Sequence, residues 1–307
     1  MDFGAINPIL LVASLMVSAT PILLAAIGEM VVEKSGVLNL GVEGMMITGA
    51  VVGFVVALNS GSPMLGFAAA ALAAAVLSLS FGILTQYLLS NQVATGLGLT
   101  LVGLGLSALI GKPYEGMKAP SLQDLHIPLL GDIPVIGPMF FQHDIMVYVS
   151  LALVAAVWAT LKYTRFGLIL RAVGESHDAA HALGYKVVRI RMMAIFFGGA
   201  CSGLGGAYLS LVRVPQWTEG MTAGAGWIAL AIVVFASWRA GRIVVGAYLF
   251  GGITVLQLNL QAAGAQVPVA LLSASPYLIT IIVLVTISAR GMHGAPASLG
   301  RPFHASH

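Results

Sequence analysis

The chain has 307 residues, of which 59% are hydrophobic and only 8% are charged. Soluble domains carry about 25% charged residues, so a soluble fold is excluded, and disorder is excluded because it requires low hydrophobicity and high charge. The net charge of +3 and the isoelectric point near 9.1 are typical of basic cytoplasmic loops in a membrane protein and do not indicate nucleic-acid binding.

Nine apolar runs follow one another along the chain and are candidates to cross a membrane. A spanning helix needs about 20 mostly apolar residues, and these runs are continuous, whereas membrane strands alternate. The runs cover residues 5–27, 39–58, 64–88, 93–111, 145–161, 192–212, 225–238, 244–262 and 268–288. The sequence therefore predicts an all-α integral membrane protein, with a single membrane domain over residues 1–290 and a short, disordered cytoplasmic tail over 291–307.

The distribution of basic residues predicts the orientation of these spans. The segment Lys162–Arg191 holds six basic residues against two acidic ones, and the positive-inside rule places such a segment in the cytoplasm. Counting spans outward from it puts the N-terminus outside and the C-terminus inside, with 11 of the 14 basic residues on the cytoplasmic side. The acidic loop from Gly111 to Asp144 is then external.

Two of the expected spans are interrupted by glycines. The second span begins with the glycine-containing stretch Ser35–Gly44, and the short seventh span begins with Gly220–Trp227. Spans that lie five apart run in opposite directions, so this arrangement predicts an inverted repeat that relates spans 1–4 to spans 6–9. Interrupted helices at matching positions of two halves point to a transporter site near the middle of the membrane, although glycine is also common in membrane helices without that role.

Glu43 is the one acidic residue well inside an expected span, and Asn39 shares its helical face. A charge at the bilayer centre costs about 2.5–3.5 kcal/mol on insertion scales, so Glu43 should face the protein interior. It either contacts the solute or accepts hydrogen bonds from backbone donors exposed at the helix break. The amide of Asn39 both donates and accepts, which makes Asn39 the leading candidate to bind sugar hydroxyls or base edges.

Two further polar groups are candidates for the solute pathway. Asn91 and Gln92 stand at the cytoplasmic start of the fourth span, where they also suit a helix start. Gln257 and Asn259 lie inside the eighth span. Polar side chains inside spans often only bond a neighbouring helix, so each group has a structural alternative to a solute contact.

The basic cytoplasmic loop contains a short candidate helix. Ser176 can cap its start and Gly184 can end it. His177 and His181 have the i, i+4 spacing of a zinc motif, but the catalytic Glu of that motif is replaced and no third ligand is apparent. We therefore expect no metal and no cofactor, and we interpret the capped helix as an element that docks into a groove of a partner protein.

Three runs of the sequence resemble one family. The run GEMVVEKSGVLNLGVEGMM at Gly28–Met46 resembles the signature of nucleoside-type permeases of ABC importers, within the wider group of ribose and branched-chain amino-acid permeases. The run RAVGESHDAAHALG at Arg171–Gly184 is similar to that group's coupling-helix segment, and Gly220–Phe235 is similar to its third marker. The resemblance extends from about Gly28 to Arg290.

This resemblance implies a multi-pass permease of the cell inner membrane that carries a nucleoside or a related sugar-containing solute and catalyses no reaction. It also implies three partners besides membrane lipid: a cytoplasmic ATPase subunit, a second permease, related or identical, and an external substrate-binding protein. The residues that would couple the permease to the ATPase are Glu175, Asp178, Ala179, Ala180, Leu183 and Gly184. The chain has neither Gly-Lys-Ser nor Gly-Lys-Thr and so no P-loop of its own. The alternative is an ion-coupled secondary carrier, which would need several buried charged residues.

Overall fold

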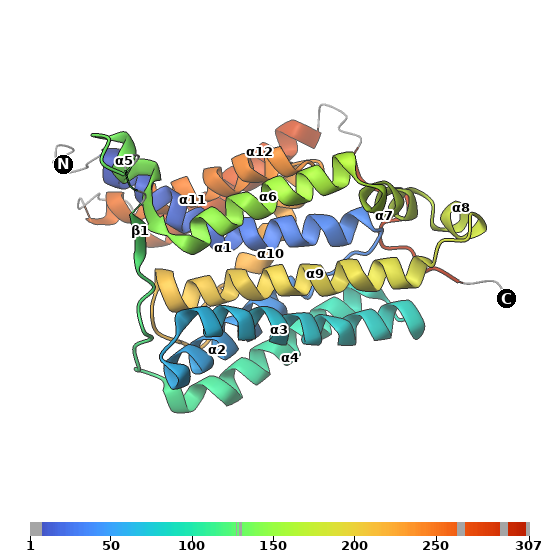
Figure 1. The fold of residues 1–307 in the computed structure, drawn as a ribbon, viewed down its shortest axis with the longest axis horizontal. Coiled ribbons are helices and arrows are strands. Elements are labelled where there is room, and N and C mark those ends of the chain that lie inside the picture. Colours follow the sequence, from blue (N-terminus) through green and yellow to red (C-terminus); the bar gives the residue numbers. More distant parts are fainter. Residues whose placement is uncertain (1–7, 127, 129–130, 263–267, 289–293, 305–307) are drawn as a thin grey trace.

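The computed structural model describes residues 8–126, 128, 131–262, 268–288 and 294–304. It is a bundle of long helices that run roughly along the long axis of the molecule (Figure 1). The long helices are α1 (Pro8–Lys34), α2 (Val42–Ser60), α3 (Pro63–Gly82), α4 (Gln92–Gly111), α6 (Ile145–Tyr163), α9 (Val187–Tyr208), α11 (Ala240–Ala262) and α12 (Val269–Ser288), with the shorter α10 (Ala225–Phe235) among them. π-helical turns extend α3 over Ile83–Tyr87 and α9 over Leu209–Arg213.

Short elements occupy the two ends of this bundle. At one end, the connection from α4 to α6 contains a 3-10 turn (Lys112–Tyr114), α5 (Ile136–Phe140) and the antiparallel strands β1 (Asp124–His126) and β2 (Gln142–Asp144). At the opposite end, α7 (Arg165–Glu175) and α8 (His177–Ala182) join α6 to α9 (Figure 1). The two loops that the sequence assigns to opposite sides of a membrane therefore lie at opposite ends of the molecule.

Within the described residues, seven helices are long and apolar enough to cross a membrane. They are α1, α2, α6 and α11, together with α3, α4 and α9, each extended by the short turn that follows it. All nine expected runs fall on helices, but the count of nine spans is not confirmed, since α10 has only 11 residues and α12 is not among the seven. Residues 5–7, where the first run was expected to begin, lie outside the described residues.

Helix α1 continues past Ile27, where the first span was expected to end, and stops only at Lys34. The added turns contain Glu29 and Glu33, and both are buried. Glu29 accepts a hydrogen bond from the backbone N of Asn39, and Glu33 accepts one from the indole of Trp238. The expectation that Glu43 is the one acidic residue inside a span is therefore wrong, because buried carboxylates with partners can extend a span beyond its apolar run.

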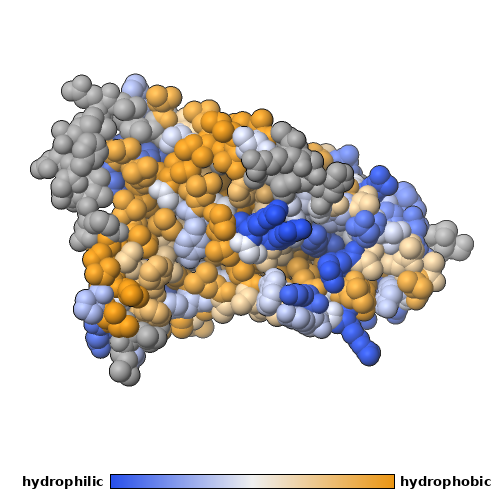
Figure 2. Space-filling view, turned by 90° about the horizontal axis from the view of Figure 1, so that it is seen from above, coloured by the Kyte–Doolittle hydropathy of each residue, from blue (hydrophilic) through white to orange (hydrophobic). Residues whose placement is uncertain are grey.

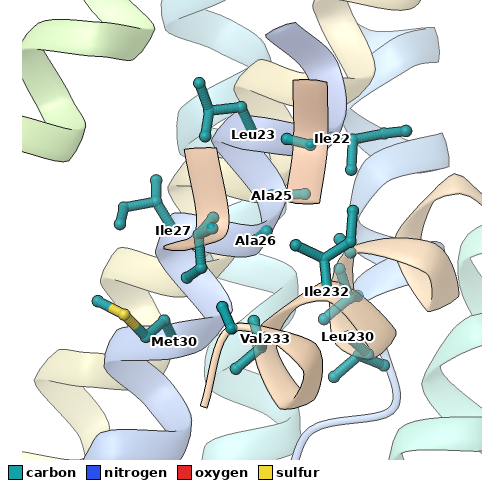
Figure 3. Close-up of a cluster of buried hydrophobic side chains, with 14 of the residues drawn as sticks. Ile22, Leu23, Ala25, Ala26, Ile27, Met30, Leu230, Ile232 and Val233 are labelled. Atoms are coloured by element: carbon teal, nitrogen blue, oxygen red, sulfur yellow. The ribbon is translucent and has the colours of Figure 1, made fainter. Parts of the chain in front are cut away.

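Helix α1 lies inside the bundle and packs against α9, α10 and α11. Figure 3 shows side chains of α1 between Ile22 and Met30 facing those of α10 between Leu230 and Val233. Between α3 and α9 the backbones approach closely, and the carbonyl of Ala70 lies where a side chain at Gly203 would begin. Because lipid tails are as apolar as these residues, close packing holds the helices together in a membrane.

The outer surface of the bundle is apolar along its middle. Leu101 and Leu109 of α4 are 71% and 76% exposed. In Figure 2 hydrophobic colour spreads over the middle of the visible face, and hydrophilic colour gathers toward the end where α7 and α8 lie. Exposed apolar surface of this extent marks contact with lipid or with another protein, as expected for a membrane protein.

Candidate solute pathway and coupling end

The first interrupted segment, Ser35–Gly41, joins α1 to α2 without helical structure. Its backbone N–H groups are satisfied by side chains from three places in the fold. Leu38 N donates to Gln92 Oε1 (2.8 Å), Asn39 N to Glu29 Oε1 (3.3 Å), and Gly41 N to Asn39 Oδ1 (2.9 Å). Within a membrane, irregular backbone persists only where such partners replace water, so this segment is held by a specific internal network.

The structure brings two expected solute residues, Asn39 and Gln92, together in this network. They are 1% and 5% exposed. The carboxamide of Asn39 closes a turn onto its own backbone, with its nitrogen 3.7 Å from Met45 Sδ. In the described part of the chain, Gln92 Nε2 and Glu29 Oε2 are buried without a hydrogen-bond partner. The oxygens of both carboxamides are thus engaged by the protein's own backbone.

Glu43 joins the first interruption to the second, which covers Val214–Gly224. Its Oε1 accepts hydrogen bonds from Thr222 Oγ1 (2.6 Å) and Gly224 N (2.9 Å), and its Oε2 accepts one from Gly226 N (2.7 Å). The carboxylate therefore caps the N-terminus of α10, where free N–H groups and the helix dipole favour negative charge. These contacts match the structural alternative for Glu43, with donors supplied by the other interruption.

The helix starts of α2 and α10 are in direct backbone contact at this cap. A Cβ atom added at Gly226 would lie 2.5 Å from Glu43 Cα, a distance that no side chain can adopt without moving one helix. Gly220 and Gly224 adopt positive φ angles of 68° and 85°, and Ala223 adopts 46°, a backbone region that favours glycine. The two interruptions therefore meet, as the inverted-repeat pattern predicts for a transporter site.

A cavity of about 370 Å³ opens beside the second interruption. Its walls come from α1, α11, α12 and the stretch from Leu209 to Ile228. Its polar lining residues are Arg213, Thr218, Thr222, Thr254, Gln257 and Tyr277. The rings of Tyr277 and Phe250 meet edge to face with centroids 6.1 Å apart. The cavity thus combines aromatic surface with hydroxyl, amide and guanidinium groups.

Arg213 stands between this cavity and a second one of about 550 Å³, which Asp124 and His143 of the β-ribbon also line. The two cavities together reach from the β-ribbon end of the bundle to the second interruption. Arg213 is half-buried and lines both cavities.

The cavity brings together only part of the remaining set of expected pathway residues. Gln257 lines it, but Asn91 and Asn259 do not. Asn91 Oδ1 accepts from Ala94 N (3.0 Å) as the N-cap of α4, and Asn259 Nδ2 donates to Val255 O (2.8 Å) in its own helix. Sequence reasoning missed Thr222, Arg213 and Tyr277. The position of Thr222 in the second interruption, and of Arg213 directly before it, could have indicated these two residues. Nothing in the sequence indicates Tyr277.

At the opposite end, α8 forms where the capped helix is expected. Ser176 Oγ accepts from Ala179 N (3.3 Å), and Gly184, with φ of +86°, donates from its N to His181 O (2.8 Å). Both predicted caps are therefore confirmed. One side of the helix, with Leu183 77% exposed, is open, but Ala180 is only 2% exposed and packs inward. Ala180, which is expected among the coupling residues, thus lies on the same side of the helix as buried His177, because i, i+3 spacing places the two together.

Residues 294–304 of the expected tail pack beneath α8. Phe303 contacts the rings of His177 and His181 edge to face, with centroids 5.4 and 5.2 Å away. Ser298 N donates to Gly174 O (2.9 Å), and Gly300 N donates to Gly36 O (3.2 Å). We call residues 294–304 the C-terminal strap. The histidine pair is engaged with it, and the described residues hold no group of three side chains suited to a metal ion.

These features define a polytopic membrane permease: apolar helices, two interruptions that meet beside a polar cavity, and a capped helix at one end. The chain belongs to the family described as branched-chain amino acid transport system / permease component, whose model matches residues 11–287. No solved structure matches it.

Three curated relatives are similar over most of their length. The putative glucose ABC transporter permease protein TsgC13 of Haloferax volcanii is 39% identical over 87% of this chain and 88% of the relative. The guanosine ABC transporter permease protein NupQ of Bacillus subtilis is 32% identical over 99% and 98%. Another guanosine permease of that bacterium, NupP, is 24% identical over 84% and 76%.

The chain is therefore an ABC transporter permease subunit of the inner membrane, a transport component and not an enzyme. Membership of this family implies an ATPase partner and a substrate-binding protein. The ion-coupled secondary carrier has no support from these relatives.

Proposed function

We propose that the chain imports a nucleoside or a related sugar-containing solute as one of two related permeases of an ABC importer. The observation that supports this proposal is the polar and aromatic cavity beside the meeting interruptions. Its volume of about 370 Å³ falls within the range of about 300–1,000 Å³ that is usual for small-molecule sites. The names of two relatives, the guanosine permease NupQ and the putative glucose permease TsgC13, agree with such a solute.

The lining groups match the parts of a nucleoside. A base presents a flat π-surface, for which Tyr277 and Phe250 offer aromatic contact. The planar guanidinium of Arg213 suits two adjacent acceptors, such as a purine carbonyl and ring nitrogen. Thr254 Oγ1 donates to Phe250 O and can accept from a ribose hydroxyl, and the amide of Gln257 is of a type that both donates and accepts. Glucose would use only the hydroxyl-binding groups.

The partner permease is proposed to be a related chain rather than an identical copy. This chain is similar to both NupQ and NupP, two guanosine permease proteins of one bacterium. Two distinct relatives that are both named for guanosine in one organism support a heteromeric pair. Co-expression with tagged copies of this chain and of its genomic neighbour would test this, and a complex containing only this chain and the ATPase would contradict it.

The substrate is tested by reconstituting the complete importer in liposomes. We expect ATP-dependent uptake of radiolabelled guanosine, with competition by inosine and weaker competition by glucose. Uptake of glucose without competition by any nucleoside would contradict the nucleoside proposal. ATP-independent uptake driven by an ion gradient would contradict the importer itself.

Coupling to the ATPase is proposed to use the open side of α8, with Glu175, Asp178, Ala179, Leu183 and Gly184. Leu183, the most exposed of the apolar side chains there, is the proposed anchor. Leu183→Glu should reduce co-purification of the ATPase without preventing membrane insertion. Leu168→Glu, which changes another exposed apolar residue at the same end, is the matched control. Normal association of the Leu183→Glu variant would contradict the docking role of α8.

The proposed orientation has the N-terminus outside and α8 in the cytoplasm. Besides the basic loop, Lys162 lies over the rings of Trp158 and Tyr163 at 4.9 and 5.1 Å, a combination typical of the membrane interface. Asp178→Cys in a Cys201→Ala background tests the orientation, since the Asp178 side chain is 81% exposed. Labelling of that thiol by an impermeant reagent from outside would contradict it.

A further inference from the structure

Arg191 of α9 is a buried cation that makes no hydrogen bond or ion pair with a carboxylate of the described residues. The residue is 0% exposed. Its guanidinium donates to four acceptors: Ser35 O (3.2 Å), Gln86 Oε1 (3.3 Å), Arg301 O (3.2 Å) and His177 Nδ1 (3.2 Å). Asp178 acts on Arg191 electrostatically but makes no ion pair with it. A buried charge without a counter-ion in direct contact is costly, and a charged residue retained in a span is a candidate functional residue.

The four acceptors belong to four separate parts of the fold. His177 is in α8, Gln86 is in the π-turn after α3, Arg301 is in the C-terminal strap, and Ser35 begins the first interruption. Only a planar group with several donors in fixed directions can hold four such partners at once. Lysine carries a single ammonium group and cannot reach all of them.

The contact with Ser35 connects α8 to the cavity through a short series of bonded segments. Ser35–Gly41 leads directly into α2, where Glu43 holds Thr222, Gly224 and Gly226. Thr222 in turn lines the cavity. Gly36 lies close beside this guanidinium, since a Cβ atom added at Gly36 would be 2.9 Å from Arg191 Nη2.

The C-terminal strap holds α8 against this arginine from the other side. Ser298 Oγ accepts from His177 N (3.3 Å) and donates to Glu175 O (3.3 Å). Phe303 is 6% exposed and closes the space beneath both histidines. Displacement of α8 therefore must move the strap, Arg191, or both.

We propose that Arg191 is the positioning residue that transmits movement of α8 to the interrupted segments, with the C-terminal strap acting as the clamp that keeps α8 on it. The proposal rests on the proposed docking of α8 to the ATPase. A contiguous set of contacts does not by itself establish transmission, so the test must measure coupling between ATP hydrolysis and transport.

The experiment uses the complete importer in liposomes with Arg191→Met, Arg191→Lys and, as matched control, Arg189→Met, which changes an exposed arginine two residues away. For Arg191→Met we expect ATPase co-purification and basal ATP hydrolysis close to wild type. We expect uptake per ATP hydrolysed to fall about tenfold, with Arg191→Lys intermediate. Arg189→Met should behave as wild type.

A second variant keeps the proposal testable if Arg191→Met destabilises the fold. Phe303→Ala leaves Arg191 in place and should also lower uptake per ATP, and the double variant should be no worse than Arg191→Met alone. Unchanged uptake per ATP in both single variants would overturn the proposal. The proposal would also be overturned if these variants lost thermal stability and assembly while the complexes that remain showed normal uptake per ATP. If instead Leu183→Glu leaves ATPase association intact, the proposed docking of α8 fails.

Discussion

The two interrupted segments differ in what their polar groups contact. In Ser35–Gly41 no residue is exposed, and side chains of Glu29, Asn39 and Gln92 bond its backbone. In Val214–Gly224 most residues are exposed or half-buried, and several line the cavity. The comparison indicates that similar glycine patterns build two different structures: a segment closed within the protein in the first half, which we propose acts as a pivot, and a cavity wall in the second, which we propose faces the solute.

Replacing Glu43, which joins the two segments, should have the largest effect. Glu43→Leu leaves three buried donors without acceptors, at about 1–3 kcal/mol each. We expect loss of uptake and a large drop in thermal stability in detergent. Glu219→Leu changes an exposed carboxylate in the second segment and should retain both properties. Wild-type stability of Glu43→Leu would show that the segments do not depend on this cap.

Arg213→Met should impair the solute-facing side alone. A hydrogen bond to a charged group contributes about 1.5–3 kcal/mol, so the KM for guanosine should rise about tenfold or more, with assembly and stability unchanged. Arg213→Lys keeps the charge and should recover part of the affinity. An unchanged KM for every solute tested would remove Arg213 from the pathway.

Asn39→Leu should impair the pivot instead. Loss of the Oδ1 acceptor leaves Gly41 N unsatisfied, at about 1–2 kcal/mol. We expect thermal stability and uptake to fall together, while the KM of the remaining activity stays near wild type. Asn59→Leu, at an exposed helix end, is the control. Normal stability with a raised KM would instead return Asn39 to the solute site.

The smallest effect concerns the pH dependence of the coupling end. Burial lowers the pKa of His177 below its usual value near 6.5, and the guanidinium of Arg191 lowers it further. Arg301 and His304 act in the same direction, and Asp178 opposes them. His177 therefore binds a proton less readily in the folded protein than in the unfolded chain. As pH falls below about 6.5, protonation favours the unfolded chain, and the free energy of unfolding decreases. Between about pH 7.5 and 5.5, wild type should lose slightly more thermal stability than His177→Gln, and equal losses would contradict this.

Periodicity and composition were enough to predict the helices and both interruptions, because lipid demands long apolar runs and glycines allow breaks. They could not predict where α1 ends, since Glu29 and Glu33 are accommodated by partners distant in sequence. The sequence predicts, as one alternative, that Glu43 accepts hydrogen bonds from backbone donors at a helix break. It does not show that these donors come from the second interruption. In the sequence, Arg191 is one of six basic residues in a loop. Its neighbours along the chain do not indicate that it is buried among four acceptors.

The C-terminal strap also has a consequence for biogenesis. Residues 294–304 leave the ribosome after all the described helices, so α8 is made long before Phe303 can close beneath it. Until then the α8 end of the bundle lacks one of its supports. A permease still being synthesised, or one truncated after α12, would present α8 without this support, so synthesis of the strap must come before the stable packing of that end.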